Sequence, residues 1–545
     1  MKPQLTSFAP LPWPAEVDPD HVRRATSRLL AHVSGQVGTD GAIRGLCDSR
    51  VLESALALSL MTRIGAVSPE RDRLLGYLQA RQHAPQRLDR VLSTLAVQRA
   101  TGEEAAGDSE LVGKLTAGVL GAAPGFISTR RRKMVSAVLS VLGCPLPADV
   151  APAADEQSPT DPLHSWAAVQ QAAVALILAT AAGVSNQATA DALRTLVATD
   201  PANTVWEGYV LMHLLTLHAL AGVPGQEATV RKGVQTVLRH QRADGGFPFV
   251  AEMHNWCTST GGIALAAAGA PLGLLHRMAG MLVTHQGGAA HATLSRGATL
   301  TGGWSMSPGV AQNDVDDTAC ALEFLQAIDP VAHGGSVRRG VDALLAVQGE
   351  DGGFPTYVAG ASSEPCMTAA AVCALAPHAS TLAAQDRALG FLADSQQADG
   401  GWEPGWSSSR LHTLFRARLA AATAGPHDRR TAAMAERIER TVRETQNDDG
   451  GWGMQPGDPS DDISTAYGVI TLTCGTDEQP IGRALAWLLE HQDADGGFSG
   501  PPDMVGPRPF PYKFPVLTDI PVLLAFGHVR SRVTGAAPVL EASVR

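Results

Sequence analysis

The sequence has no excess of positive charge and no long apolar run. Acidic residues outnumber basic ones by 53 to 42, which leaves a net charge of −11. A nucleic-acid partner requires a basic surface, so we expect none, and an anionic ligand would need a local basic patch. The longest apolar run, 172–184, is shorter than the roughly 20 residues that span a bilayer. We therefore expect no stable membrane insertion.

Paired cysteines and targeting signals are also lacking. The 545 residues include seven cysteines, an odd number without any Cys-x-x-Cys pair, which is typical of free thiols in a reducing compartment. The first residues contain no apolar run preceded by positive charge, so we expect no signal peptide. These features together predict a cytoplasmic protein.

Strand patterns are missing throughout the chain. No segment shows sustained alternation, and apolar residues recur at helical spacing instead, which predicts an all-α fold. The chain exceeds the size at which one hydrophobic core stops growing, so we expect at least two domains. The Pro-, Ala- and Asp-rich stretch 145–162 is predicted to be a loop between helical hairpins.

The second half contains a repeat. A Gln is followed by an Asp-Gly-Gly turn and then, six residues after the Gln, by an aromatic residue, in five copies: Gln241 and Phe247, Gln348 and Phe354, Gln396 and Trp402, Gln446 and Trp452, Gln492 and Phe498. The last four Gln residues lie 48, 50 and 46 residues apart. This period predicts an array of helical hairpins, in which the Gln bonds backbone groups of a neighbouring unit and the aromatic residue packs.

A sixth copy, Gly302-Gly303-Trp304, lacks the Gln and carries acidic residues instead. In three regular copies a Thr follows the aromatic residue by 13 or 14 residues and opens an Ala-rich helix: Thr260, Thr368 and Thr465. Thr318 stands in the same phase after Trp304, and it is preceded by Asp314-Val315-Asp316-Asp317. The sequence thus predicts three carboxylates at a helix N-terminus.

Three explanations of these carboxylates stay open from spacing alone. Asp suits a helix cap, although three in four residues repel one another. Adjacent carboxylates also bind hard cations such as Mg²⁺. Alternatively, crowded carboxyl groups cannot all ionise easily, so one can stay protonated and serve as an acid.

The segment Asp314-Val315-Asp316-Asp317-Thr318-Ala319, together with the Gln-xxx-Gly-aromatic repeats, resembles the class II terpene cyclases, which include squalene–hopene cyclases and copalyl-type diphosphate synthases. Trp304 and the segment 88–96 add to the likeness to copalyl-type enzymes. The resemblance implies two (α/α) barrels with the active-site cavity between them. One barrel would comprise 1–35 and 251–545, and the inserted one 36–250.

The resemblance also implies roles for single residues. Asp316 would donate the proton to the terminal alkene of an isoprenoid, and Asp314 and Asp317 would orient it and share its charge. Trp304 and Trp256 would present π faces to the substrate cation. Trp406 is a further candidate of this kind.

The densest basic cluster is Arg130-Arg131-Arg132-Lys133, in the expected inserted domain. The resemblance places diphosphate binding in that domain, assisted by Mg²⁺. We therefore predict that Arg131, Arg132 and Lys133 contact the diphosphate and that Mg²⁺ is the cofactor, with no protein ligands to the metal assigned. A solvated helix face is the alternative.

The predicted function is cyclisation of geranylgeranyl diphosphate to a bicyclic copalyl-, labdane- or clerodane-type diphosphate. Because no Asp-Asp-x-x-Asp motif is present, the diphosphate should be retained, for a separate class I terpene synthase to process. Alternatives are farnesyl diphosphate, giving drimenyl diphosphate, and squalene, although the low aromatic content of 5% favours a shorter diphosphate substrate. Outside the family, the alternatives are a zinc protein like the prenyltransferase β-subunits, using Asp317, Cys320 and His412, or a non-catalytic helical-repeat binding protein.

Overall fold

The computed structural model describes residues 12–102, 128–145, 165–287, 300–403, 405–424, 428–506 and 510–534. The chain divides into two compact units. Unit 1 comprises Met1–Leu46, Met253–Met504 and Lys513–Arg545, and unit 2 comprises Cys47–Glu252 and Val505–Tyr512. Unit 2 therefore starts later than the expected 36–250 and takes in a second segment far along the chain. Most of the expected loop 145–162 lies outside the described residues.

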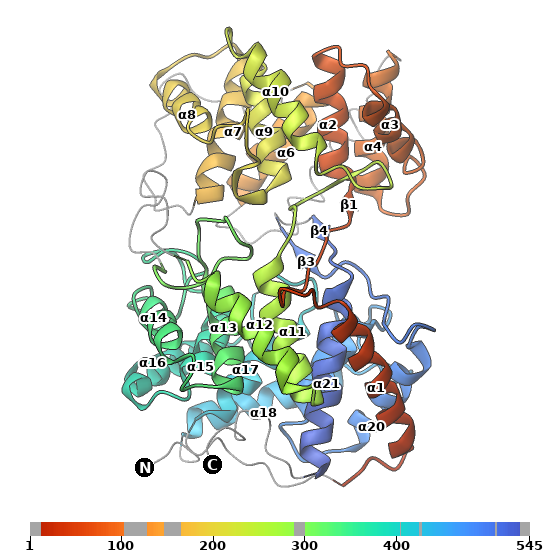
Figure 1. Cartoon of the computed structure of the whole chain (residues 1–545), viewed down its shortest axis with the longest axis vertical. Coiled ribbons are helices and arrows are strands. Elements are labelled where there is room, and N and C mark those ends of the chain that lie inside the picture. The colour runs from red at the N-terminus through yellow and green to blue at the C-terminus, as the bar shows by residue number, and fades with distance from the viewer. Residues whose placement is uncertain are drawn as a thin grey trace. The chain divides into compact units, whose positions relative to one another are not determined.

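Unit 1 is built on a closed ring of inner helices (Figure 1). They are α11 (His254–Ala268), α13 (Val315–Ile328), α15 (Pro365–Leu375), α17 (Leu411–Ala422), α19 (Asp462–Leu472) and α21 (Val516–Thr534). Each inner helix contacts the next one, and α21 contacts α11. These helices are apolar on nearly every face, because they are buried on both the inner and the outer side of the ring.

An outer layer covers this ring. It consists of α12 (Leu272–Thr284), α14 (Gly334–Leu345), α16 (Leu382–Ser395), α18 (Arg429–Glu444), α20 (Gln479–His491) and α1 (Pro19–Gly35). Each outer helix packs on the inner helix before it, and α1 packs on α21. These helices are amphipathic: α18 buries only Thr431, Met434, Ile438 and Val442, at the spacing of one helix face. The predicted array of helical hairpins is confirmed.

The Gln of each repeat joins two hairpins, as predicted. The side-chain amide of Gln446 donates to the carbonyl oxygens of Gly450, in its own turn, and of Pro480, in the next outer helix, at 2.7 and 2.9 Å. Gln348 makes the equivalent bonds to Gly352 and Ala384. Because the second acceptor belongs to the following outer helix, each Gln fixes one hairpin against the next.

The sixth copy does have this Gln, contrary to the sequence interpretation. Gln286 donates to the carbonyl oxygens of Gly302 and Ser336 at 2.6 and 2.9 Å. In the sequence, 15 residues separate Gln286 from the pair Gly302-Gly303, whereas three residues separate the Gln from the Gly pair in the other copies. Because of this insertion, the spacing did not reveal the Gln.

The Thr residues hold the turns in place with one exception. The backbone N–H of Trp304 donates to Thr318 Oγ1 at 3.0 Å, and Phe354 and Trp452 are held in the same way by Thr368 and Thr465. Thr260 has the same spacing after Phe247 but does not bind it: Phe247 lies in unit 2, where its N–H donates to Ser54 Oγ at 2.9 Å.

Unit 2 is also helical. Its described helices are α2 (Val51–Arg63), α3 (Pro69–Gln79), α4 (Arg87–Thr101), α6 (Ser128–Val141), α7 (Ser165–Ala182), α8 (Gln187–Val197), α9 (Val210–Leu220) and α10 (Glu227–Leu238). Helices α4, α2, α9, α7 and α6 contact one another in that order, and α3, α8 and α10 pack outside them. The described strands are β1 (Ser49–Arg50), β2 (Phe247–Pro248), β3 (Met504–Val505) and β4 (Pro511–Tyr512), so the all-α prediction is confirmed.

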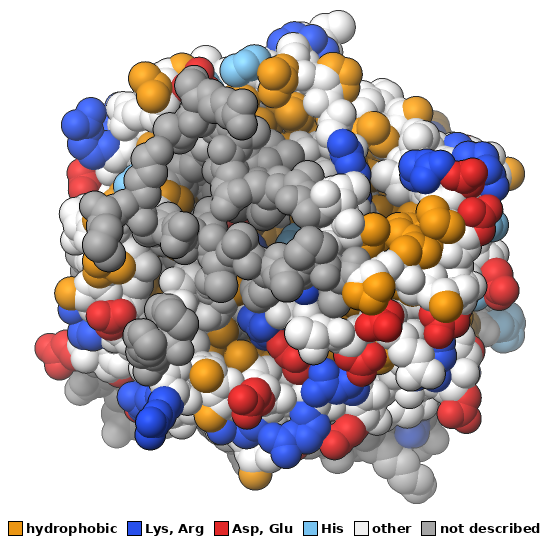
Figure 2. Space-filling view, turned by 90° about the horizontal axis from the view of Figure 1, so that it is seen from below, with side chains coloured by type: hydrophobic (Ala, Val, Ile, Leu, Met, Phe, Trp, Pro, Cys, Tyr) orange, Lys and Arg blue, Asp and Glu red, His pale blue; other side chains and the backbone are white. Residues whose placement is uncertain are grey.

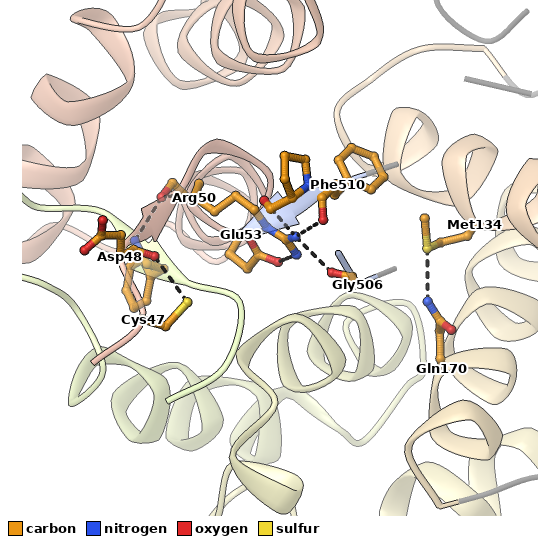
Figure 3. Close-up of polar contacts among 11 residues, drawn as sticks. Cys47, Asp48, Arg50, Glu53, Met134, Gln170, Gly506 and Phe510 are labelled. Atoms are coloured by element: carbon orange, nitrogen blue, oxygen red, sulfur yellow. Dashed lines mark hydrogen bonds and ion pairs between the residues drawn. The ribbon is translucent and has the colours of Figure 1, made fainter. Parts of the chain in front are cut away.

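A buried arginine ties the second segment of unit 2 to its first helix (Figure 3). Arg50, before α2, donates to the carbonyl oxygens of Gly506 and Phe510, both at 2.9 Å, and forms an ion pair with Glu53. Its guanidinium also lies 4.5 Å from the ring centroid of Phe249. Because the charge is paired and its donors are used, Arg50 can be buried while it fixes a segment that is distant in sequence.

The described surface shows no field of a single sign on the face drawn in Figure 2, where basic and acidic side chains are interspersed. None of the helices within the described ranges combines the length and the apolar character needed to cross a membrane.

Candidate active site

The predicted acidic segment forms the start of α13 in unit 1. Asp314 is the N-cap residue: its backbone is extended, and its side chain accepts a hydrogen bond from the N–H of Asp317 at 2.8 Å. Asp316 and Asp317 occupy the first turn, where the helix dipole favours negative charge. Capping therefore explains Asp314 but not its two neighbours.

Asp314 and Asp317 form a buried pair of carboxyl groups, with 7% and 4% of each residue exposed. Burial raises the pKa of Asp314 to about 6, although hydrogen bonds from Asp317 lower it. Burial, followed by the charge of Asp314, raises the pKa of Asp317 well above its usual range. Two carboxyl groups this close do not both ionise readily, so the pair favours a shared proton.

Asp316 has different neighbours. Its Oδ1 lies 3.4 Å from Nη2 of Arg416, which reaches it from α17, and 4.0 Å from the sulfur of Cys320. The guanidinium also binds Glu323, with 3.1 Å between Nη1 and Oε1. Burial raises the pKa of Asp316, and the charge of Arg416 opposes that shift. Asp316 is thus a buried carboxyl held beside a cation that is already paired.

The two predicted tryptophans lie in different surroundings. Trp304 is fully buried, its indole N–H donates to the carbonyl of Leu282 in α12 at 2.7 Å, and its ring fills the space beside Gly340 of α14. The ring of Trp304 therefore packs between helices. Trp256 stands in the first turn of α11. The loop 304–306 bonds the first turns of both α11 and α13, so Trp256 lies at the same end of the ring as Asp316.

A second aromatic group lies beside Arg416. The rings of Phe415 and Tyr467 stack, with centroids 4.7 Å apart and an angle of 13° between their planes. His412 packs edge-on against both of them, and the guanidinium of Arg416 lies 5.7 Å from the centroid of Phe415. Trp406 contacts Tyr357 and donates to Glu364 at 3.1 Å. Unit 1 therefore contains a group of aromatic rings beside Arg416, the residue that binds Asp316.

The predicted basic cluster is on α6, in unit 2. Arg131 is buried, Arg132 and Lys133 are half-buried, and Arg130 is exposed. The cluster and the acidic segment thus belong to different units. Arg132 and Lys133 are adjacent on α6, and both are partly exposed to solvent.

Sequence reasoning missed Arg416 and Glu323. Glu323 stands seven residues after Asp316, so both lie on one face of α13. This spacing could have identified Glu323 from the sequence as a neighbour of the acidic segment. Arg416 is one of two buried arginines on α17, beside Arg418, and a buried charged residue requires a partner. Its partner is 100 residues away in sequence, so only the fold identifies it.

Metal ligands are not gathered in the part of the chain that the structure covers. It contains no group of three or more His, Cys, Asp or Glu side chains that could hold a metal ion. The zinc set of Asp317, Cys320 and His412 is therefore not formed, which removes the support for the zinc-protein alternative.

Three comparisons place the chain among known proteins. The family model of the prenyltransferase alpha-alpha toroid domain matches residues 318–504. A drimenyl diphosphate synthase of Streptantibioticus cattleyicolor is 36% identical over 512 residues, covering 93% of this chain and 94% of the relative. A second drimenyl diphosphate synthase, of Streptomyces showdoensis, is 37% identical over 520 residues, with the same coverage of both chains.

The fold also matches a solved structure. The ent-copalyl diphosphate synthase of Streptomyces platensis superposes with a TM-score of 0.58 at 20% identity, covering 93% of this chain and 99% of that one. That likeness concerns the fold, whereas the two sequence relatives extend over nearly the whole chain. The protein belongs to the class II terpene cyclases.

Proposed function

We propose that the enzyme cyclises farnesyl diphosphate to drimenyl diphosphate. The observation that supports this substrate most strongly is the likeness, at 36 and 37% identity over nearly the whole chain, to two drimenyl diphosphate synthases. The predicted C20 substrate, geranylgeranyl diphosphate, is the alternative to be tested beside it.

Asp316 is the proton donor in this proposal. The bond between its carboxyl oxygen and the proton breaks, and the terminal alkene takes the proton to form a tertiary carbocation. Two ring closures follow, and loss of a proton from a neighbouring carbon gives an isomer of the substrate. Asp314 and Asp317 orient Asp316 and share its charge in this proposal, as neighbouring carboxyl groups that do not all ionise readily.

The diphosphate serves as an anchor rather than a leaving group. Arg132 and Lys133 are the proposed contacts, since their side chains supply charged donors to phosphate oxygens. Mg²⁺ would be carried with the diphosphate, because this ion is usually bound by phosphate oxygens, water and only one or two carboxylates. When bound, it would neutralise charge on the diphosphate. An enzyme that removes or ionises the diphosphate must then consume the product.

Incubation with farnesyl and geranylgeranyl diphosphates, followed by mass spectrometry of the untreated reaction, tests the proposal. We expect a product with the mass of farnesyl diphosphate, with the diphosphate intact and an altered retention time. Faster turnover of geranylgeranyl diphosphate would overturn the chain length. Stoichiometric release of pyrophosphate would overturn the retention of the diphosphate.

A further inference from the structure

Three side chains form a stripe along the inner face of α13. Asp316, Cys320 and Glu323 follow one another at intervals of four and three residues, so they lie above one another on the helix. Arg416 meets this stripe from α17, although α15 lies between α13 and α17 in the ring. Arg416 therefore reaches across the ring interior instead of bonding to an adjacent helix.

The guanidinium is shared between two carboxyl groups. Its Nη1 lies 3.1 Å from Oε1 of Glu323, and its Nη2 lies 3.4 Å from Oδ1 of Asp316. The side chain of Arg416 is 8% exposed, and those of Glu323 and Asp316 are 16% and 15% exposed. In such dry surroundings, a single cation cannot fully compensate two carboxylates, so one of the two tends to hold a proton.

Among the described residues, the groups that interact with Asp316 and Arg416 include no second cation. The titratable groups that act on Asp316 or Arg416 from the helices around them are Asp314, Asp317, Cys320 and Glu323 on α13, Cys366 and Cys373 on α15, His412 on α17 and Tyr467 on α19. Burial lowers the pKa of His412 to about 3, so its imidazole is neutral at physiological pH. Among these groups, Arg416 alone is positively charged.

We propose that Arg416 and Glu323 form a positioning pair for the proton donor. Arg416 holds Oδ1 of Asp316, so that the proton resides on the other oxygen, and it binds the carboxylate that remains when the proton has moved to the alkene. Glu323 holds Arg416 in place and offsets its charge while the acid is loaded. This inference rests on the role of Asp316 given above.

The electron and proton balance is simple. The electrons of the broken O–H bond stay on Asp316, whose new negative charge is met by the guanidinium. Because this charge develops only as the proton leaves, the contact with Arg416 is stronger in the transition state than before it and accelerates the step. The acid is reloaded with one proton from water or from the final deprotonation.

Two substitutions should shift the pH at which Asp316 ionises in opposite directions. With Glu323→Gln, Asp316 becomes the sole counter-ion of Arg416, which favours its charged form. With Arg416→Gln, the stabilising cation is gone, which favours the protonated form. A donor works only while protonated, so activity is lost as pH rises through its pKa. We expect the alkaline limb of kcat to move by about one to three pH units, to lower pH for E323Q and to higher pH for R416Q.

The maximal rate provides a second readout. We expect R416Q to lower kcat by about 10²- to 10³-fold, as loss of one preorganised charge contact does, with little change in KM. The matched controls are Arg418→Gln and Glu439→Gln, which break another buried pair that includes α17, with 2.8 Å between Arg418 Nε and Glu439 Oε1. They should leave the limb in place.

A substrate-free measurement separates this inference from the proposed function. The infrared C=O band of protonated Asp316, assigned by its loss in D316N, should titrate at lower pH in E323Q and at higher pH in R416Q. Equal or absent shifts in the folded variants would overturn the positioning pair, whatever substrate the enzyme uses. If R416Q does not fold, the near-isosteric E323Q decides alone: an unshifted band in this variant overturns the inference.

Discussion

Asp316 differs from Asp314 and Asp317 in the partners of its carboxyl group. Asp314 and Asp317 face each other and a backbone N–H at the start of the helix, whereas Asp316 faces a guanidinium across the ring. Three identical side chains within four residues therefore have different surroundings: Asp314 caps the helix, Asp317 is its buried neighbour, and Asp316 is the proposed proton donor.

We predict that Asp316→Asn lowers cyclisation by about 10²- to 10⁴-fold without loss of the fold, because Asn is nearly isosteric but cannot act as the acid. Asp314→Asn is the matched control. Asn also caps a helix, so this variant should fold and should keep more activity than D316N. Product formation measured by mass spectrometry, together with the circular dichroism of each variant, checks the prediction. Near wild-type turnover by D316N would show that another group is the acid.

The acidic segment could be predicted from sequence because its three carboxylates are adjacent and stand in the phase of the repeat. Arg416 could not, because its contact depends on how α13 and α17 face each other around the ring. The packing of Trp304 between helices could not be predicted from sequence either. An aromatic residue after a Gly pair can face either side of its helix, and here its N–H is bound to α12.

At the level of helices, neighbouring hairpins are connected by a recurring joint. Each joint consists of a Gln amide that donates to two carbonyl oxygens in different hairpins. The joint at Gln286 retains these bonds in spite of the insertion that follows it. Its bond lengths resemble those of Gln446, in an uninterrupted copy. The Gln therefore makes the same two bonds with and without the insertion.

We predict that Gln286→Met and Gln446→Met destabilise unit 1 by similar amounts. Met fills much the same volume but leaves two carbonyl groups without their donor, which costs about 1–3 kcal/mol. Denaturant-induced unfolding of both variants measures the change in free energy. If Q286M were nearly as stable as the unsubstituted protein while Q446M was not, the interrupted copy would not function as a repeat.

The periodicity of the repeat predicted these helices well because each copy satisfies the same backbone groups. The turn at Phe247 has the same residues but lies in unit 2, in agreement with the predicted bounds of the inserted domain. There Ser54 takes the place that Thr occupies elsewhere. A local pattern identifies a turn, but it does not say which hairpin completes it.

At the scale of the whole molecule, the proposed function requires an acidic protein to bind an anionic substrate. The basic residues of α6 are the densest local exception to the net charge of −11. Arg131 is buried there, so replacing it would test stability as well as binding. Arg132 and Lys133 are the better probes.

We predict that Arg132→Ala with Lys133→Ala raises KM for the prenyl diphosphate by at least about tenfold, the equivalent of one lost hydrogen bond to a charged group, with little effect on kcat. Arg231→Ala with Lys232→Ala, an adjacent Arg–Lys pair exposed on α10, is the matched control. Steady-state kinetics at fixed ionic strength distinguishes the two. An unchanged KM in the α6 variant would mean that Arg132 and Lys133 belong to a solvated helix face and do not bind the substrate.

The division into units was predictable only in outline. Two helical regions with different patterns indicated an inserted unit, but nothing in the segment Val505–Tyr512 marks it as a part of unit 2. The segment is attached by hydrogen bonds that Arg50 donates to its backbone carbonyl oxygens. Every residue has such a carbonyl, so the sequence does not reveal which ones accept.

This attachment has a consequence for biosynthesis. The ribosome delivers residues in order, so Arg50 has no carbonyl acceptors from Gly506 and Phe510 until the chain has been extended past Tyr512. The ring of unit 1 likewise lacks its closing helix until α21 has been made. Neither unit can therefore finish folding in the order in which it is translated. Both units are completed by the same late part of the chain, which comprises Val505–Tyr512 and α21. A premature stop before this part would therefore leave both units incomplete.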